Sequence, residues 1–175
     1  PPLTLALASK LSEVARSARL DVLHVHYAVP NAVAAQLARS ILGASAPPMV
    51  VTLHGTDVSP LGADPALRPV VRSGLLDAAG ITAPSRYLAR LAGDQLGLAR
   101  DVEVIPNFVD PARFEGRSPR RGSAPFTVVH VSNFRPVKRV GDAVAAFARV
   151  VTEVEARLLL VGDGPERPAV EAQVR

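Results

Sequence analysis

Polar residues that can bind or orient a substrate follow two predicted strands in the first part of the chain. Residues 21–26 alternate as a strand does, which places His24 and His26 on one face, and Tyr27 comes directly after them. Histidine donates and accepts hydrogen bonds near neutral pH, and tyrosine adds a hydroxyl. For His24 the favoured interpretation is a core histidine satisfied by the backbone, whereas Tyr27 is expected at a site.

His54 ends the second predicted strand, residues 49–54, and is followed by Gly55, Thr56 and Asp57. Glycine lets the backbone approach a ligand closely. Ligands of open α/β sheets bind at the carboxyl ends of the strands, so His54 and Thr56 are candidate site residues. The alternative is an ordinary turn with an aspartate cap. A metal site would need more ligands than this cluster offers, and none is predicted.

A different chemistry is indicated near the end of the chain, where cations follow a predicted strand at residues 126–131. Asn133, Arg135, Lys138 and Arg139 lie between that strand and a predicted helix at residues 140–150. Guanidinium groups, an ammonium group and a helix N-terminus together attract an anion, and a diphosphate is the natural ligand. A solvated basic loop is the alternative.

Glycines follow the last predicted strand, residues 157–161, in the segment Gly162-Asp163-Gly164-Pro165-Glu166. Pro165 suits the first position of a helix. The glycines permit close approach of the backbone to a nucleotide, although many strand–helix turns share this composition. The segment is neither a Walker pattern nor a full dinucleotide fingerprint.

Strands and helices that alternate over short distances must position these residues. In the first part of the chain the predicted strands are residues 21–26, 49–54, 80–83 and 102–105, and the predicted helices are 3–18, 32–42, 66–78 and 85–96. This alternation predicts an α/β fold with parallel sheets covered by helices. The predicted domains are residues 1–105, a turn-rich basic linker at 106–125, and residues 126–175.

Both predicted domains are expected to be incomplete. The helix at residues 3–18 has no strand before it, and the second domain has only two strands, too few for a stable domain of this kind.

The composition limits the classes of function. The chain is 48% hydrophobic and 21% charged, which is typical of globular proteins, and no stretch is long and apolar enough for a membrane span. No cysteine is present, which excludes disulfides and a cysteine nucleophile and fits a cytoplasmic protein. With 4% aromatic residues, nucleic-acid binding through base stacking is not expected. The sequence leaves open whether the protein is a homo-oligomer.

The order and spacing of several motifs resemble the retaining glycosyltransferases of family 4, which have the GT-B fold of two Rossmann-like domains. The motifs are residues 105–110 (Ile-Pro-Asn-Phe-Val-Asp), Lys138 and the segment from Gly162 to Glu166. Residues 24–30, 52–57 and 132–140 are similar to members of that family that use UDP-N-acetylglucosamine as donor and L-malate as acceptor, in bacillithiol biosynthesis. The resemblance covers nearly the whole chain.

The resemblance implies a retaining transfer of N-acetylglucosamine to the malate hydroxyl without a metal ion or another cofactor, in a cleft between an N-terminal acceptor domain and a C-terminal donor domain. His54 would contact the donor sugar, and Arg135 and Lys138 would neutralise the leaving diphosphate. The expected donor-binding residues are Asn133, Gly162, Gly164 and Glu166, and the expected acceptor-binding residues are Tyr27, Thr56 and Arg72.

Two departures and three alternatives accompany this prediction. Many family members have arginine at the position of Asn133, a change for which Arg135 can compensate. A glycine-rich loop before residue 1 and paired glutamates after residue 175 are expected but lie outside the sequence, so this polypeptide alone is not expected to be active. The alternatives are another acceptor, such as inositol phosphate or a lipid, a non-catalytic nucleotide-sugar-binding module, and a hydrolase built on His54 and Asp57.

Overall fold

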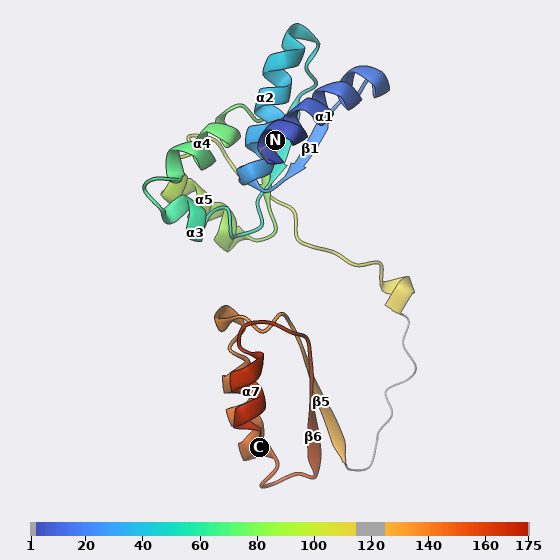
Figure 1. Cartoon of the computed structure of the whole chain (residues 1–175), viewed down its shortest axis with the longest axis vertical. Helices are drawn as coiled ribbons and strands as arrows, with labels where there is room; N and C mark the ends of the chain where they lie inside the picture. Colours follow the sequence, from blue (N-terminus) through green and yellow to red (C-terminus); the bar gives the residue numbers. More distant parts are fainter. Residues whose placement is uncertain (1–2, 115–124, 175) are drawn as a thin grey trace. The chain divides into compact units, whose positions relative to one another are not determined.

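The computed structural model of the 175-residue chain describes residues 3–114 and 125–174, and these residues form two units, Pro1–Val109 and Asp110–Arg175 (Figure 1). Each unit contains its own parallel sheet covered by helices, which confirms the predicted α/β class. The boundary between the units lies within the predicted linker, and residues 115–124 of that linker lie outside the described part.

The sheet of the first unit has four parallel strands in the order β1-β2-β3-β4. Their bounds are β1 Leu23–His26, β2 Met49–Thr52, β3 Gly80–Ala83 and β4 Glu103–Val104. The register places His26 beside Thr52, and Thr52 beside Thr82. The ends of β1 and β2, where the predicted site residues begin, therefore lie side by side.

Five α-helices belong to this unit: α1 Leu3–Ala18, α2 Val33–Leu42, α3 Pro60–Ala63, α4 Arg68–Leu76 and α5 Arg86–Leu96. The sequence did not predict α3, nor the π-helical turn η1 (Ala28–Ala32) and the 3₁₀ turn η2 (Gly43–Ser45) that flank α2. The ends of α5 follow ordinary capping chemistry, since the Ser85 hydroxyl accepts from the Leu88 N–H and Gly97 takes the left-handed conformation that ends the helix.

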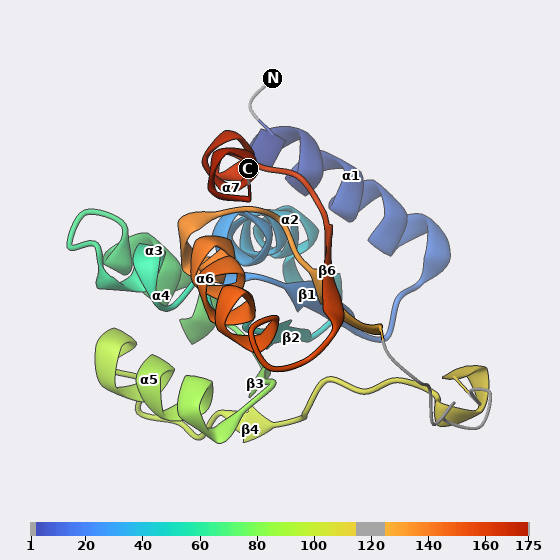
Figure 2. The same ribbon diagram turned by 90° about the horizontal axis from the view of Figure 1, so that it is seen from below.

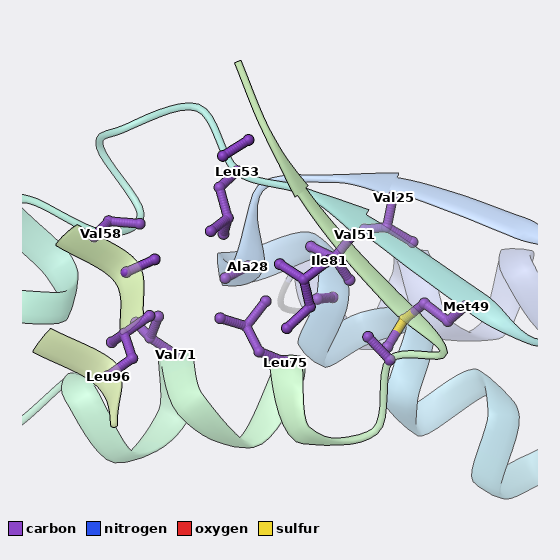
Figure 3. Packing of buried hydrophobic residues seen from close by; sticks show 14 of the residues in the cluster. Val25, Ala28, Met49, Val51, Leu53, Val58, Val71, Leu75, Ile81 and Leu96 are labelled. Atoms are coloured by element: carbon purple, nitrogen blue, oxygen red, sulfur yellow. The ribbon is translucent and has the colours of Figure 1, made fainter. Parts of the chain in front are cut away.

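One face of the first sheet forms the core. Figure 3 shows Val51 and Ile81 on the strands and Val71 and Leu75 on α4, and all four side chains are buried in one cluster. Buried and exposed residues alternate along β1. Leu23 and Val25 are buried in this core, whereas His24 and His26 point to the other face and are exposed. The helices thus cover one face, and the other face presents polar side chains.

The second unit has two parallel strands, β5 Phe126–Val131 and β6 Ala156–Val161, with helices α6 Val140–Val150 and α7 Arg167–Gln173 on one side of them (Figures 1 and 2). Short 3₁₀ turns occupy Pro111–Phe114 (η3) and Pro136–Lys138 (η4). Among residues 125–174 the buried side chains are Phe134, Val140, Val144 and Val170.

The start of α7 corrects one prediction. The helix begins at Arg167 with Pro168 in its first turn, and Pro165 lies in the preceding turn instead of at the first helical position. That turn is held by the Arg167 N–H, which donates to the Gly164 carbonyl at 3.0 Å. Among the described residues, no helix is both long and apolar enough to cross a membrane.

Candidate active site

Three side chains meet where β1 and β2 end. His26 Nδ1 lies 2.8 Å from His54 Nε2, so the two imidazoles share a hydrogen bond. The Tyr27 ring lies beside the same histidine, with ring centroids 4.6 Å apart. The structure therefore brings two of the predicted site residues, Tyr27 and His54, into one cluster and adds His26 to them.

Asp57 fixes the backbone that carries this cluster. Its carboxylate is fully buried, and its Oδ1 accepts from the N–H groups of His54 at 3.1 Å and Gly55 at 2.9 Å. Its Oδ2 accepts from the N–H of Ala28 at 3.2 Å, across 29 residues of sequence. The turn with an aspartate cap is thus correct for Asp57, but the cap also joins the loop after β1 to the loop after β2.

Tyr27 has a backbone conformation that few residues other than glycine adopt, with φ 71° and ψ 133°. Its N–H donates to the Thr52 carbonyl at 3.0 Å, and its own carbonyl accepts from the Ala32 N–H at 3.2 Å. Such strain persists where surrounding contacts determine the backbone, and it is concentrated at functional sites. The strained conformation supports a role for Tyr27 in binding.

His24 differs from the favoured sequence interpretation. It is exposed, not in the core, and its Nε2 lies 2.8 Å from the Thr52 hydroxyl, which in turn lies 2.7 Å from the hydroxyl of Thr82. The prediction of a core histidine satisfied by the backbone is wrong because the alternate residues Leu23 and Val25 take the buried face.

These side chains line a pocket of about 530 Å³ in the first unit. Its walls come from the polar sheet face and the segment after β4: Val22, His24, His26, Val50, Thr52, His54, Thr82, Ile105, Pro106, Asn107 and Phe108. Thr52 and Thr82 were not predicted as parts of this surface. Their alternation with buried residues in two neighbouring strands was the signal that could have found them.

The remaining predicted acceptor residues lie apart from this hydrogen-bonded cluster. Thr56 is exposed in the turn after Gly55. Arg72 is exposed on α4, and its Nη2 donates to the Gly97 carbonyl at 3.4 Å, at the end of α5. Among the described contacts, none joins Arg72 to Tyr27, Thr56 or His54.

In the second unit, the loop after β5 carries the predicted cations. Arg135 and Lys138 are exposed at the two ends of the η4 turn, where the Lys138 N–H donates to the Arg135 carbonyl at 2.8 Å. Neither side chain forms an ion pair within residues 3–114 and 125–174, whereas Arg139 pairs with Asp142. Two cations are therefore available for an anion from outside.

The turn after β6 packs directly on the loop after β5 through Phe134, which is buried. The Phe134 N–H donates to the Asp163 carbonyl at 2.8 Å, and the Phe134 carbonyl accepts from the Glu166 N–H at 2.9 Å. These backbone bonds hold Asn133 and Glu166, both predicted donor-binding residues, on two loops that are fastened together.

Gly162 and Gly164 are required by this contact. Their φ angles are +144° and +154°, and a Cβ atom at these positions would lie 1.8 Å from the Ser132 carbonyl oxygen and 2.6 Å from the Phe134 carbonyl oxygen, respectively. From the sequence, these glycines were expected to permit the approach of a nucleotide. The structure supplies a nearer reason, which is the approach of the chain's own loop.

The guanidinium of Arg167, just after this turn, lies beside acidic side chains. Hydrogen bonding and attraction to Glu171, with a further attraction to Asp163, raise the pKa of Arg167. Arg167 therefore remains charged beside the turn that carries the glycines, and it neutralises acidic neighbours on that side.

A parallel α/β fold with polar residues at the strand ends and a basic loop before a helix places candidate binding groups where ligands of such folds bind. The model of Glycosyltransferase Family 4 matches residues 1–113, more than half of the chain, and the chain belongs to that family. The predicted resemblance is thereby confirmed.

The chain is also similar to the N-acetyl-alpha-D-glucosaminyl L-malate synthase of Bacillus anthracis, with 44% identity over 173 residues. The alignment covers 95% of this chain and 45% of that relative, so the chain spans about half the length of the protein it matches. Because the match extends over both units, it includes the cluster around His54 and the basic loop around Lys138.

Proposed function

We propose that the protein to which this chain belongs is a retaining, metal-independent glycosyltransferase that moves N-acetylglucosamine from UDP-N-acetylglucosamine to the hydroxyl of L-malate. The observation that carries the proposal is the 44% identity, over 95% of the chain, to a synthase whose name states that product. Residues 1–105 would belong to the acceptor domain and residues 126–175 to the donor domain, with 106–125 as the linker.

The first unit would bind the acceptor and the donor sugar. His54 would contact a hydroxyl of the sugar and help to stabilise the positive charge that develops on the ring during transfer. Tyr27, whose ring lies beside that of His54, and Thr56, in the turn that follows, would supply hydroxyl groups, and the guanidinium of Arg72 is the proposed partner of a malate carboxylate. Its present contact, a 3.4 Å bond to the Gly97 carbonyl, is long enough to be exchanged for a carboxylate.

The second unit would bind the nucleotide and accept the leaving charge. Negative charge on the diphosphate grows as the glycosidic bond breaks, and cations placed there stabilise the transition state more than the ground state. Arg135 and Lys138 are suited to this role because both are exposed and neither is engaged by an acidic residue in the described part of the chain. Their positive charge would provide the neutralisation that a metal ion provides in other transferases. Asn133, Gly162, Gly164 and Glu166 would border the nucleotide.

The direct test uses the full-length protein, UDP-N-acetylglucosamine and one acceptor at a time. We expect UDP release that depends on L-malate, an α-linked product by NMR, and no loss of rate in the presence of a chelator. If the protein uses inositol phosphate far better than malate, the family assignment stands and the proposed acceptor is wrong. Binding of the donor without any transfer would instead identify a nucleotide-sugar-binding module.

Lys138→Ala sharpens the test, because the chain contains just one other lysine, Lys10, which pairs with Glu13 on α1. Loss of a charge-assisted contact costs roughly 1.5–3 kcal/mol, so we expect kcat to fall by about one to two powers of ten. The KM for malate should change little. Lys10→Ala is the matched control and should leave both constants unchanged. Equal kcat in Lys138→Ala and the unmodified protein would remove Lys138 from the mechanism.

A further inference from the structure

The hydrogen bond between His26 and His54 constrains both imidazole rings. It joins Nδ1 of His26 to Nε2 of His54 at 2.8 Å, and a single proton lies between the two nitrogens. A neutral imidazole carries one N–H, so the location of this proton decides the tautomer of each ring. If His54 Nε2 holds it, both rings are Nε2–H tautomers, and if His26 Nδ1 holds it, both are Nδ1–H tautomers.

The same bond determines which nitrogen of His54 can meet a ligand. Nε2 is occupied by His26, and among the described contacts Nδ1 of His54 has no partner. The ring is half-buried and lies against Tyr27, at a centroid distance of 4.6 Å. Nδ1 is therefore the ring nitrogen of His54 that is left for a ligand.

We propose that His26 is a positioning residue for His54. It accepts the Nε2–H of His54, keeps that ring in the Nε2–H tautomer and so presents the lone pair of Nδ1 to a hydroxyl of the donor sugar. The choice between the two tautomers rests on the proposed function, because an accepting nitrogen adds electron density to a sugar on which positive charge develops, whereas a donating nitrogen withdraws it.

The surroundings of His26 fit a role in positioning. Its side chain is exposed on the polar face of β1, outside the hydrophobic core, so the fold does not depend on its packing. The strand itself is held by its parallel register with β2, in which His26 lies beside Thr52. The Asn31 side chain donates to the His26 carbonyl at 2.8 Å and further fixes the backbone from which the imidazole projects.

Long-range ¹H–¹⁵N NMR of the full-length protein, labelled at histidine and recorded at about pH 8, above the ordinary pKa of free imidazole, tests the tautomers. The signals of the two rings are assigned by their loss in His26→Asn and His54→Gln. We expect Nε2–H tautomers in both rings and a His54 Nε2–H proton protected from exchange with water. An Nδ1–H tautomer in either ring overturns the proposal.

Replacement of His26 separates positioning from simple packing. The amide of Asn lies where Nδ1 lies, whereas the amide of Gln lies farther along the side chain. We expect the protected His54 Nε2–H proton to persist in His26→Asn and to exchange rapidly in His26→Leu and His26→Gln. His24→Leu removes a ring that packs on His26, with centroids 4.5 Å apart, but no hydrogen bond to it; this control should leave that proton protected. Protection that survives in His26→Leu overturns the proposal.

Kinetics with UDP-N-acetylglucosamine and malate complete the test. One hydrogen bond lost corresponds to about a three- to tenfold fall in kcat for His26→Leu and His26→Gln, with the KM for malate unchanged. His26→Asn should stay within about twofold of the unmodified protein. If the unmodified protein and the three His26 variants have equal kcat, the role of His26 is overturned. Absence of transfer by the unmodified protein would reject the proposed function, while the NMR result would still decide whether His26 sets the tautomer of His54.

Discussion

The two units of the chain use the same strand–loop–helix design but bury their strands differently. In the first unit the strands alternate, with Leu23, Val25 and Val51 in a core and His24 and His26 on the accessible face. In the second unit most residues on both faces of the strands are apolar, and Val129 and Val131 remain 53% and 71% exposed. Strands with apolar residues on both faces are typical of parallel sheets covered on both sides. The first unit thus buries the apolar face of its own strands, whereas the strands of the second unit need further packing to cover their exposed apolar side chains.

The loops at the strand ends are also held together by different groups in the two units. The loops after β1 and β2 of the first unit are fastened by one side chain, the buried carboxylate of Asp57. The loops after β5 and β6 of the second unit are fastened by backbone groups around Phe134, which can approach only because Gly162 and Gly164 have no side chain. In both units two loops at the strand ends are held together. A charged side chain does this in the first unit, and in the second unit the absence of side chains at two glycines allows it.

The largest effect is expected when the two units are separated. A fragment of residues 1–109 contains a core drawn from its strands and helices, whereas in a fragment of residues 110–175 the described residues cluster four buried side chains. We expect a cooperative urea transition, followed by circular dichroism, for the first fragment and a broad, non-cooperative change for the second. A sharp transition of the second fragment would show that its exposed strands need no further partner.

Gly162→Ala tests the backbone contact in the second unit. The new Cβ would meet the Ser132 carbonyl oxygen at 1.8 Å, and a φ of +144° is strained for alanine. Overpacking and backbone strain together cost about 3–5 kcal/mol in the free energy of unfolding of the full-length protein. Gly55→Ala is the matched control in the first unit, since φ is +107° there but nothing lies within 4 Å, and strain alone costs about 1–2 kcal/mol. Equal losses would mean that the close contact is not what requires Gly162.

Much of the fold could be predicted from the sequence because it depends on local patterns. Alternation gave the faces of β1, and the residues Ser85 and Gly97 marked the ends of α5. What could not be predicted depends on partners far apart in the chain. The amide that Asp57 reaches at Ala28 is 29 residues away, and the carbonyl that excludes a side chain at Gly162 belongs to Ser132. The candidate residues Tyr27 and His54 were predicted from their types and strand-end positions, whereas the pairing of His26 with His54 needed the register of β1 with β2.

Asp57→Asn tests the side-chain fastening in the first unit. The amide oxygen can still accept from His54 and Gly55, but the amide N–H₂ would face the Ala28 N–H, where two donors cannot bond. We expect the free energy of unfolding to fall by about 2–3 kcal/mol, from urea denaturation. Asp64→Asn is the control, because Asp64 accepts from a single exposed N–H, that of Ala66, and should lose less than about 1 kcal/mol. Similar losses in both variants would show that Asp57 is an ordinary turn cap.

The smallest expected effect concerns binding and divides the proposed roles of the two units. Arg72 contacts the Gly97 carbonyl at 3.4 Å, and Arg16 on α1 contacts the Ile41 carbonyl at the same distance, so the two arginines form a matched pair with equally weak structural contacts. If Arg72 binds a malate carboxylate, Arg72→Ala should weaken malate binding by at least about tenfold, or 1.4 kcal/mol, whereas Arg16→Ala should not. Binding of UDP-N-acetylglucosamine, measured by calorimetry, should be unchanged in both variants because neither arginine is a proposed donor-binding residue. Malate-dependent UDP release measures the acceptor side separately. Unchanged malate saturation in Arg72→Ala would make Arg72 a structural arginine like Arg16 and would leave Tyr27 and Thr56 as the acceptor residues to test.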